Sequence, residues 1–254
     1  MPSPIGLSGK LVDVTDAARL PKPYVVRTGL DEILADLAVD DPVPSERELA
    51  VRFGVARETV RQALHELLVQ GRIERRGRGT VVARPKLTQP LSLKSYTEGA
   101  VKMGRVPGRI SVIWREIAAT AELAAALDIA EGATVIHLER ILLADGQRIG
   151  LESTYLSAAR FGFLDPSLGS ASFDPTTSLY AAIRSRGVEF GSAVERIETV
   201  LPSPREAELL ESTTAMPMLL LNRRSLDVDG TPIETVRALY RGDRVAFEAI
   251  LRDG

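Results

Sequence analysis

The chain of 254 residues contains no cysteine, which excludes disulfide frameworks, thiolate catalysis and cysteine-ligated zinc or iron–sulfur sites. Its two histidines, His65 and His137, lie far apart in the sequence, so a histidine-rich metal cluster is excluded as well. No apolar run reaches the ~18 residues that a membrane helix needs, and the first ten residues lack the apolar segment of a secretory signal. We therefore expect a cytoplasmic protein with no membrane partner, no metal and no cofactor.

Charge is the second informative feature, because the net value of −2 conceals an uneven distribution. Residues 47–86 carry 10 basic and 4 acidic side chains, whereas residues 1–46 carry 4 and 8, and residues 87–254 carry 18 and 22. A basic segment within a neutral chain is typical of a nucleic-acid-binding face. The alternative is a solvated charged helix, and the arrangement of the segment decides between them.

The basic segment lies in a run of helical patterns. Residues 1–22 show no periodicity and are expected to form a flexible tail. Helices are predicted from Tyr24 to about Val39, from a capping box at Ser45–Glu48 to Phe53-Gly54, and from about Arg57 to Gln70, ended by Gly71. A basic hairpin follows, with strands at residues 73–76 and 80–83. This order is typical of a winged helix-turn-helix domain, which we place at residues 23–84.

In such a domain the second helix of the pair enters the major groove of DNA with its N-terminal residues against base edges. Arg57, Thr59 and Arg61 occupy that place, and an arginine fork can bind guanine through two hydrogen bonds. Arg47 is expected at a phosphate or a flanking base. The hairpin tip adds Arg75, Arg76, Gly77 and Arg78, where glycine lets the backbone approach the minor groove closely.

After a linker predicted at residues 85–94, the pattern changes to strands, which defines a domain at residues 95–254. Strands are predicted at Ile110–Ile117, Thr134–Leu143, Arg148–Leu156, Glu189–Leu201, Met218–Asp227, Thr231–Arg241 and Val245–Leu251, and short helices at Ala121–Leu127, Ser178–Arg186 and Pro204–Glu211. Strands outnumber helices and hairpin turns are frequent, so the domain is expected to be α+β on an antiparallel sheet.

Two hairpins of this domain look alike, since Arg140…Gly146…Glu152 resembles Arg223…Gly230…Glu234. The spacings are unequal, so we interpret the likeness as coincidence or distant duplication rather than a functional repeat. A three-residue loop at 144–146, with Gly146 left-handed, would place Arg140 and Glu152 on one face of the sheet. A two-residue loop would place them on opposite faces.

The N-terminal motifs resemble the GntR family of DNA-binding regulators. The likeness rests on Pro44-Ser45-Glu46-Arg47-Glu48-Leu49-Ala50, on the run from Phe53-Gly54-Val55-Ala56-Arg57-Glu58-Thr59 to Leu64, and on Gly71 and Gly77-Arg78-Gly79-Thr80. It implies a homodimer on double-stranded operator DNA with two-fold symmetry, contacted by Arg47, Arg57, Thr59 and Arg61, with Gly77 in the minor groove. Ala56 departs from the usual Ser or Thr and removes a helix cap.

The C-terminal part resembles the effector-binding (UTRA) domain of the HutC subfamily, which shares its fold with chorismate lyase. The likeness is strongest to aminosugar-responsive repressors, which implies glucosamine-6-phosphate or N-acetylglucosamine-6-phosphate as the effector. The positions that match the family's pocket are Tyr96, Thr97, Arg140, Leu142, Glu152, Ser178, Tyr180, Glu234 and Tyr240. Arg140 and Ser178 would bind the phosphate, and Glu152 and Glu234 the sugar hydroxyls or the amino group. Leu142 departs from relatives that carry a second arginine there.

Other functions remain as alternatives. Another sugar phosphate or a small acid would suit the same subfamily. An enzyme with a chorismate-lyase-like domain would need a nucleophile or an acid–base pair, and the sequence has no triad, metal motif or Gly-rich phosphate loop. RNA binding fits poorly, because aromatic residues make up 5% and none cluster in the basic segment.

Overall fold

The computed structural model describes residues 21–165, 174 and 176–251, and residues 1–20 of the expected tail lie outside this part. The chain divides between Arg84 and Pro85 into two compact units. In the part of the chain that is described, no helix is both long and apolar enough to cross a bilayer. Each unit has its own hydrophobic core.

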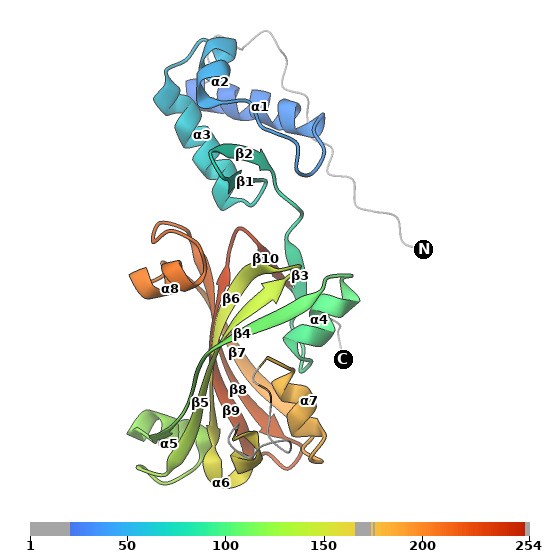
Figure 1. Ribbon diagram of the computed structural model, residues 1–254, viewed down its shortest axis with the longest axis vertical. Helices are drawn as coiled ribbons and strands as arrows, with labels where there is room; N and C mark the ends of the chain where they lie inside the picture. Colours follow the sequence, from blue (N-terminus) through green and yellow to red (C-terminus); the bar gives the residue numbers. More distant parts are fainter. Residues whose placement is uncertain (1–20, 166–173, 175, 252–254) are drawn as a thin grey trace. The chain divides into compact units, whose positions relative to one another are not determined.

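The N-terminal unit is a three-helix domain with a β-hairpin (Figure 1). Its elements are α1 (Lys22–Ala35), α2 (Glu46–Phe53), α3 (Arg57–Val69), β1 (Ile73–Arg76) and β2 (Gly79–Val82). Leu30, Leu49 and Leu67, one from each helix, are fully buried in one core. The first helix begins at Lys22 and ends at Ala35, earlier than the predicted Val39, because Asp36 caps it with its backbone amide and a turn follows.

Local signals set the helix boundaries as the sequence indicates. The hydroxyl of Ser45 accepts a hydrogen bond from the amide of Glu48 (3.3 Å), and the Glu48 carboxylate accepts one from the Ser45 amide (2.8 Å), which completes the capping box. Gly54 and Gly71 adopt left-handed φ angles of 64° and 70° after α2 and α3. Ala56 precedes α3 without a side-chain cap, as predicted.

The C-terminal unit is α+β and is built on one six-stranded antiparallel sheet in the order β4-β5-β6-β9-β8-β7. The strands are β4 (Pro107–Ala118), β5 (Thr134–Ala144), β6 (Gln147–Ser157), β7 (Phe190–Val200), β8 (Met218–Asp227) and β9 (Pro232–Arg241). The helices are α4 (Tyr96–Lys102), α5 (Ala121–Leu127), α6 (Ala158–Phe161), α7 (Leu179–Arg184) and α8 (Pro204–Leu209), with a 3-10 turn at Gly162–Leu164. The expected fold class is confirmed.

Part of the segment predicted as a linker, residues 85–94, forms a strand. β3 (Leu87–Pro90) pairs in parallel with β10 (Val245–Glu248) and belongs to the C-terminal unit. Its alternate residues Leu87 and Gln89 are buried. A segment this short carries too little pattern to be distinguished from a linker, and its partner lies at the opposite end of the unit.

The loop between β5 and β6 is the shorter of the two alternatives. It has two residues, Asp145 and Gly146, both with positive φ (50° and 79°), which is the turn that suits a tight hairpin. A register shift next to Leu142 nevertheless places Arg140 directly opposite Glu152. The β-bulge therefore restores the shared face that a regular two-residue hairpin would have abolished.

The two faces of the sheet carry different cores because side chains alternate along each strand. One face gathers Leu142, Ala238 and Tyr240 with Leu87 and Val245 of the small sheet. The other face packs Ile141, Leu151, Met218 and Leu239 against Leu210, at the end of α8. The first face, on the side of α4 and α7, contains the pocket described below.

Candidate functional site

The N-terminal unit presents exposed cations at the start of α3. Arg57 and Arg61 are exposed and Thr59 is half-buried. Arg61 donates to Glu58 (2.8 Å) and to Glu46 (3.3 Å), whereas no described residue forms an ion pair with Arg57. Exposed ion pairs contribute only ~0.2–1 kcal/mol to stability, so Arg61 can exchange its carboxylate partners for another anion at little cost.

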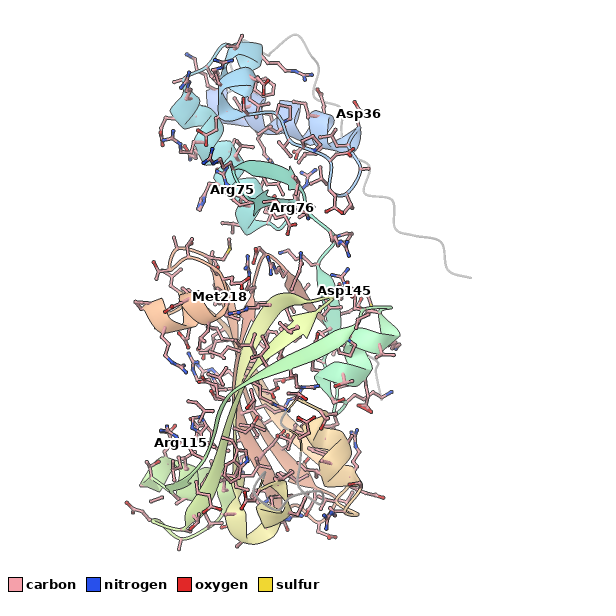
Figure 2. The ribbon with its side chains drawn as sticks, in the orientation of Figure 1. Asp36, Arg75, Arg76, Arg115, Asp145 and Met218 are labelled. Atoms are coloured by element: carbon pink, nitrogen blue, oxygen red, sulfur yellow. The ribbon has the colours of Figure 1, made fainter. Side chains whose placement is uncertain are left out.

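The hairpin adds a second group of cations. Arg75 and Arg76 leave β1 in opposite directions, as consecutive strand residues do (Figure 2). Arg75 donates to Thr80 (3.0 Å), while Arg76 pairs with Asp40 and Glu74, both at 2.6 Å. The tip, Gly77-Arg78, is exposed, and Gly77 has a φ of 59° with no heavy atom near its missing Cβ.

Arg47 completes this surface from the second position of α2, where it is exposed and has no ion-pair partner among the described residues. The unit therefore places every predicted DNA-contact residue where solvent can reach it. The acidic groups nearest to them, such as Glu46 and Glu58, are already paired with Arg61. Such a surface suits a polyanion.

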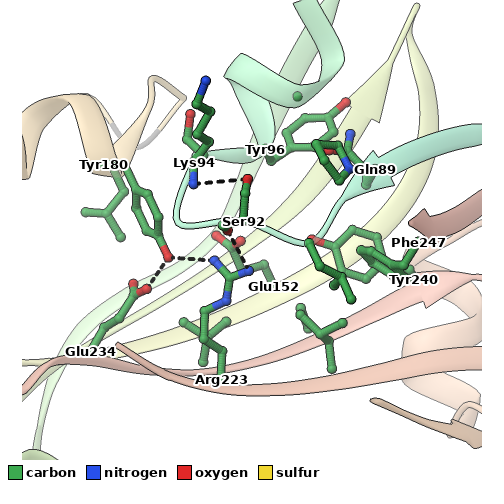
Figure 3. Close-up of a pocket in the computed structure, with 18 of the residues that line it drawn as sticks. Gln89, Ser92, Lys94, Tyr96, Glu152, Tyr180, Arg223, Glu234, Tyr240 and Phe247 are labelled. Carbon is green, nitrogen blue, oxygen red and sulfur yellow. Dashed lines mark hydrogen bonds between the residues drawn. The ribbon is translucent and has the colours of Figure 1, made fainter. Parts of the chain in front are cut away.

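The C-terminal unit contains a polar pocket between the sheet face, the segment that follows β3, and the starts of α4 and α7 (Figure 3). It encloses about 60 Å³ of free space. Its polar lining consists of Gln89, Ser92, Lys94, Ser95, Tyr96, Arg109, Arg140, Glu152, Tyr180, Arg223, Glu234 and Tyr240. Such a density of charged groups on a buried sheet face is typical of a ligand site and not of a packing core.

An ion pair forms the floor of the pocket. Arg140, 2% exposed, donates to the carboxylate of Glu152 and to the carbonyl of Thr177 (3.2 Å). Burial raises the pKa of Glu152, but the guanidinium groups of Arg140 and Arg109 outweigh burial and hold that pKa below its usual value. Glu152 is therefore ionised at neutral pH.

A second cluster joins α7 to strands β8 and β9 (Figure 3). The hydroxyl of Tyr180 donates to Glu234 and accepts from Arg223 (3.2 Å), and Arg223 also pairs with Glu195 (2.7 Å). Burial raises the pKa of Glu234 to about 7, because its hydrogen bonds and the charge of Arg223 only partly offset the loss of solvation. Glu234 can therefore hold a proton near neutral pH.

Several polar atoms of the pocket lack partners. Among the described residues, buried side-chain atoms without a hydrogen bond include Gln89 Nε2, Arg109 Nε, Arg140 Nε and Glu234 Oε2, and all four side chains line this pocket. A buried polar atom without a partner costs ~1–3 kcal/mol, and folded proteins rarely leave such atoms together. A polar ligand or water would supply the missing hydrogen bonds.

The pocket brings together most of the residues predicted for it. Tyr96, Arg140, Glu152, Tyr180, Glu234 and Tyr240 line it. Glu234 and Tyr240 both line the pocket although they lie six residues apart along β9. Thr97, the residue after Tyr96, does not line the pocket, but its hydroxyl accepts a hydrogen bond from the pocket residue Arg109 (2.8 Å).

Besides Thr97, two other predicted residues do not line the pocket. Ser178 caps α7, with its hydroxyl accepting from the amide of Ala181 (3.3 Å). Leu142 is fully buried in the core beside the pocket. Ser178 is the N-cap of α7, and a hydroxyl at that position binds a free backbone amide of the helix. Leu142 packs with the apolar side chains of this sheet face.

Sequence reasoning missed Arg109, Arg223, Lys94 and Gln89, which also line the pocket. One signal was available for Arg223. The likeness between the two hairpins pointed to this residue, but it was interpreted as non-functional. The structure places Arg140, Glu152, Arg223 and Glu234 in the same pocket. Their pairing is not repeated, since Arg223 pairs with Glu195 and not with Glu234.

Comparison with known proteins agrees with this architecture. The model of the family "Bacterial regulatory proteins, gntR family" matches residues 30–82, and that of the UTRA domain matches residues 102–246. The chain is 52% identical to the HTH-type transcriptional repressor PhnF of Mycolicibacterium smegmatis, over 92% of this chain and 94% of that protein. The chain belongs to the gntR family of bacterial regulatory proteins.

A second relative and a solved structure of PhnF support the assignment of this gntR-family chain. It is 34% identical to the HTH-type transcriptional repressor NagR of Bacillus subtilis, over 84% of this chain and 86% of that protein. The crystal structure of PhnF from Mycobacterium smegmatis matches with a TM-score of 0.66 at 52% identity and covers 90% of this chain and all of that chain. The matching family and these relatives are described as regulators, and not as the chorismate-lyase-like enzyme considered as an alternative.

Proposed function

We propose that this gntR-family chain is a cytoplasmic transcriptional repressor that binds operator DNA through its N-terminal unit and a small anionic effector in the pocket of its C-terminal unit. The names of the relatives support repression, because PhnF and NagR are both described as HTH-type transcriptional repressors. The observation that carries the effector site is the set of unpartnered buried polar atoms on Gln89, Arg109, Arg140 and Glu234 in one pocket.

The DNA-binding part of the proposal rests on the exposed cations of α3 and the hairpin. Arg57, Thr59 and Arg61 project from the first turns of the helix that reads the major groove in this class of domain. Arg47 would bind a phosphate, and the tip at Gly77 would approach the minor groove with Arg75, Arg76 and Arg78 around it. A homodimer on an operator with two-fold symmetry follows, since one unit reads one half-site.

The pocket favours an effector that is both anionic and rich in hydroxyl or amino groups. Arg140 is placed to bind a phosphate group through a charge-assisted hydrogen bond, while Glu152 and Glu234 can accept from hydroxyls or an amine. Glucosamine-6-phosphate and N-acetylglucosamine-6-phosphate have this chemistry.

The size of the pocket supports a second candidate, a smaller oxyanion. Its free space of about 60 Å³ is well below the ~300–1,000 Å³ typical of small-molecule sites. A hexose phosphate would have to displace the segment around Ser92. Two hydrogen bonds hold this segment: the carbonyl of Ser92 accepts from Arg223 (3.2 Å), and the carbonyl of Leu93 accepts from Arg184 (2.9 Å). A small phosphorylated or phosphonic acid would need less opening.

The DNA-binding role is tested by selecting duplexes from a random pool with the full-length chain and measuring binding of the selected duplex by fluorescence anisotropy. We expect an inverted repeat. Arg57→Ala should weaken binding ~5- to 150-fold per half-site, because one bidentate base contact in each half-site is worth ~1–3 kcal/mol, and should relax one position in each half-site. Arg47→Ala should lower the slope of log K against log salt by about 0.9 per half-site with the same sequence preference. His65→Ala, exposed on the same helix, is the control.

The effector is tested by calorimetric titration with glucosamine-6-phosphate and N-acetylglucosamine-6-phosphate, with glucose-6-phosphate and methylphosphonate for comparison. Binding of an aminosugar phosphate but not glucose-6-phosphate would support the first candidate, and Arg140→Ala and Glu152→Ala should then abolish it. Binding of methylphosphonate alone would favour the smaller oxyanion. If none binds or releases the operator, the effector part of the proposal is wrong.

A further inference from the structure

Arg109 is a pocket cation that forms no direct ion pair with a carboxylate of the described residues. It stands on β4 directly opposite Leu142 of β5, and paired residues of neighbouring strands share a face. Arg140 lies two residues before Leu142 on the same face, and both arginines line the pocket. The β4–β5 ladder therefore places two guanidinium groups on one wall.

The surroundings of Arg109 orient its side chain without neutralising it. One terminal nitrogen donates to the hydroxyl of Thr97 (2.8 Å), and the guanidinium carbon lies 5.5 Å from the ring centre of Tyr96. Its Nε is buried without a partner. No described carboxylate forms an ion pair with Arg109, while Glu152 is already paired with Arg140.

The charge balance on this wall is therefore positive. Burial lowers the pKa of Arg109, and the neighbouring positive charge of Arg140 lowers it further. Arg140 is itself nearly fully buried, and its Nε also lacks a partner. Two buried like charges that act on a single carboxylate, Glu152, destabilise the pocket unless a further anion binds.

We propose that Arg109 and Arg140 together bind a tetrahedral phosphoryl oxyanion, and that Arg109 sets the preference of the pocket for a phosphoryl group over a carboxylate. This inference rests on the proposed effector site and names the chemistry of its ligand. Each guanidinium offers a planar fork that can donate two hydrogen bonds. A phosphoryl group presents three oxygens and up to two negative charges, which suit two forks, whereas a carboxylate is satisfied by one.

Thr97 and Tyr96 hold Arg109 in place. The hydroxyl oxygen of Thr97, which does not itself line the pocket, accepts a hydrogen bond from Arg109 (2.8 Å). The stacking of Tyr96 keeps the guanidinium plane in place before the ligand arrives. Arg109 thus acts as a specificity-determining residue supplied by a neighbouring strand.

The test is calorimetric titration of the full chain with inorganic phosphate, methylphosphonate and acetate, together with glucosamine-6-phosphate to distinguish a free phosphoryl anion from a phosphate ester. Arg109→Gln should weaken phosphoryl binding roughly 10- to 150-fold, as expected for lost charge-assisted hydrogen bonds, and Arg109→Lys should fall between. Acetate binding should change much less. Arg115→Gln, on the same strand but paired opposite His137 outside the pocket, is the control.

Thermal unfolding separates binding from structure. Removing a cation that lacks a carboxylate partner should leave the midpoint of Arg109→Gln unchanged or raise it, whereas a merely structural arginine would lower it. Equal phosphate affinity in wild type and Arg109→Gln would overturn the proposal, as would no binding of any phosphoryl probe to wild type. If an aminosugar phosphate still releases the operator in the Arg109→Gln variant as in wild type, this inference alone fails. If no compound releases it, the proposed effector function fails too.

Discussion

Glu234 should make the stability of the C-terminal unit depend on pH in a direction opposite to that of a typical paired carboxylate. It is fully buried. Its Oε1 accepts hydrogen bonds from Tyr180 and from Ser225 (3.0 Å), while its Oε2 has no partner. Burial raises its pKa from 4.5 to about 7. The native state therefore holds a proton that the unfolded chain releases between these two values.

The sign and size of the effect follow from proton linkage. Because the folded pKa is the higher one, the stabilising contribution is complete below pH 4.5 and is lost as pH rises to about 7. Each pH unit within that window is worth ~1.4 kcal/mol. Between pH 5.5 and pH 8 the wild-type unit should lose on the order of 2 kcal/mol through this one group.

The perturbation is Glu234→Gln, which keeps the shape of the side chain and removes its titration. Urea unfolding followed by the fluorescence of Trp114, the one tryptophan of the chain, reports on the C-terminal unit. We expect the variant to lose ~2 kcal/mol less than wild type between pH 5.5 and pH 8. Glu152→Gln is the comparison variant: it breaks the pair with Arg140 and should lower stability at both pH values, and because the charge of Glu152 helps to raise the pKa of Glu234, it should also reduce the slope, but less than Glu234→Gln does. Equal slopes for wild type and Glu234→Gln would refute the reasoning.

Two further predictions concern the framework of each unit. Ala56→Ser supplies the missing side-chain cap of α3 and should stabilise the N-terminal unit by ~1 kcal/mol, seen as a higher midpoint in far-UV circular dichroism; an unchanged midpoint would mean that the serine does not cap. Gly150→Ala would place a Cβ 2.8 Å from the ring of Tyr240 and 3.2 Å from the carbonyl of Leu239. Overpacking of this kind costs ~1–3 kcal/mol, so the Trp114-monitored unfolding midpoint and the effector affinity should both fall, and an unchanged affinity would show that Tyr240 does not shape the pocket.

The residues by themselves determined much of the N-terminal unit, because its signals are local. The capping box at Ser45 and Glu48, the left-handed Gly54 and Gly71, and the hairpin tip at Gly77 each act within a few residues of the chain. Most strands of the C-terminal sheet were also predicted close to their observed bounds, because turn residues separate them along the chain. The family likeness then added roles for Arg57 and its neighbours.

The tertiary structure alone decided how the pocket is assembled, because strand register and burial depend on partners that are distant in sequence. The bulge beside Leu142 returned Arg140 and Glu152 to one face after a turn that should have separated them. The pairing of β4 with β5 brought Arg109 opposite Leu142, and the order of the sheet brought Arg223 from β8 to the same cavity. Register across six strands is set by the whole core, so no short stretch of sequence carries it.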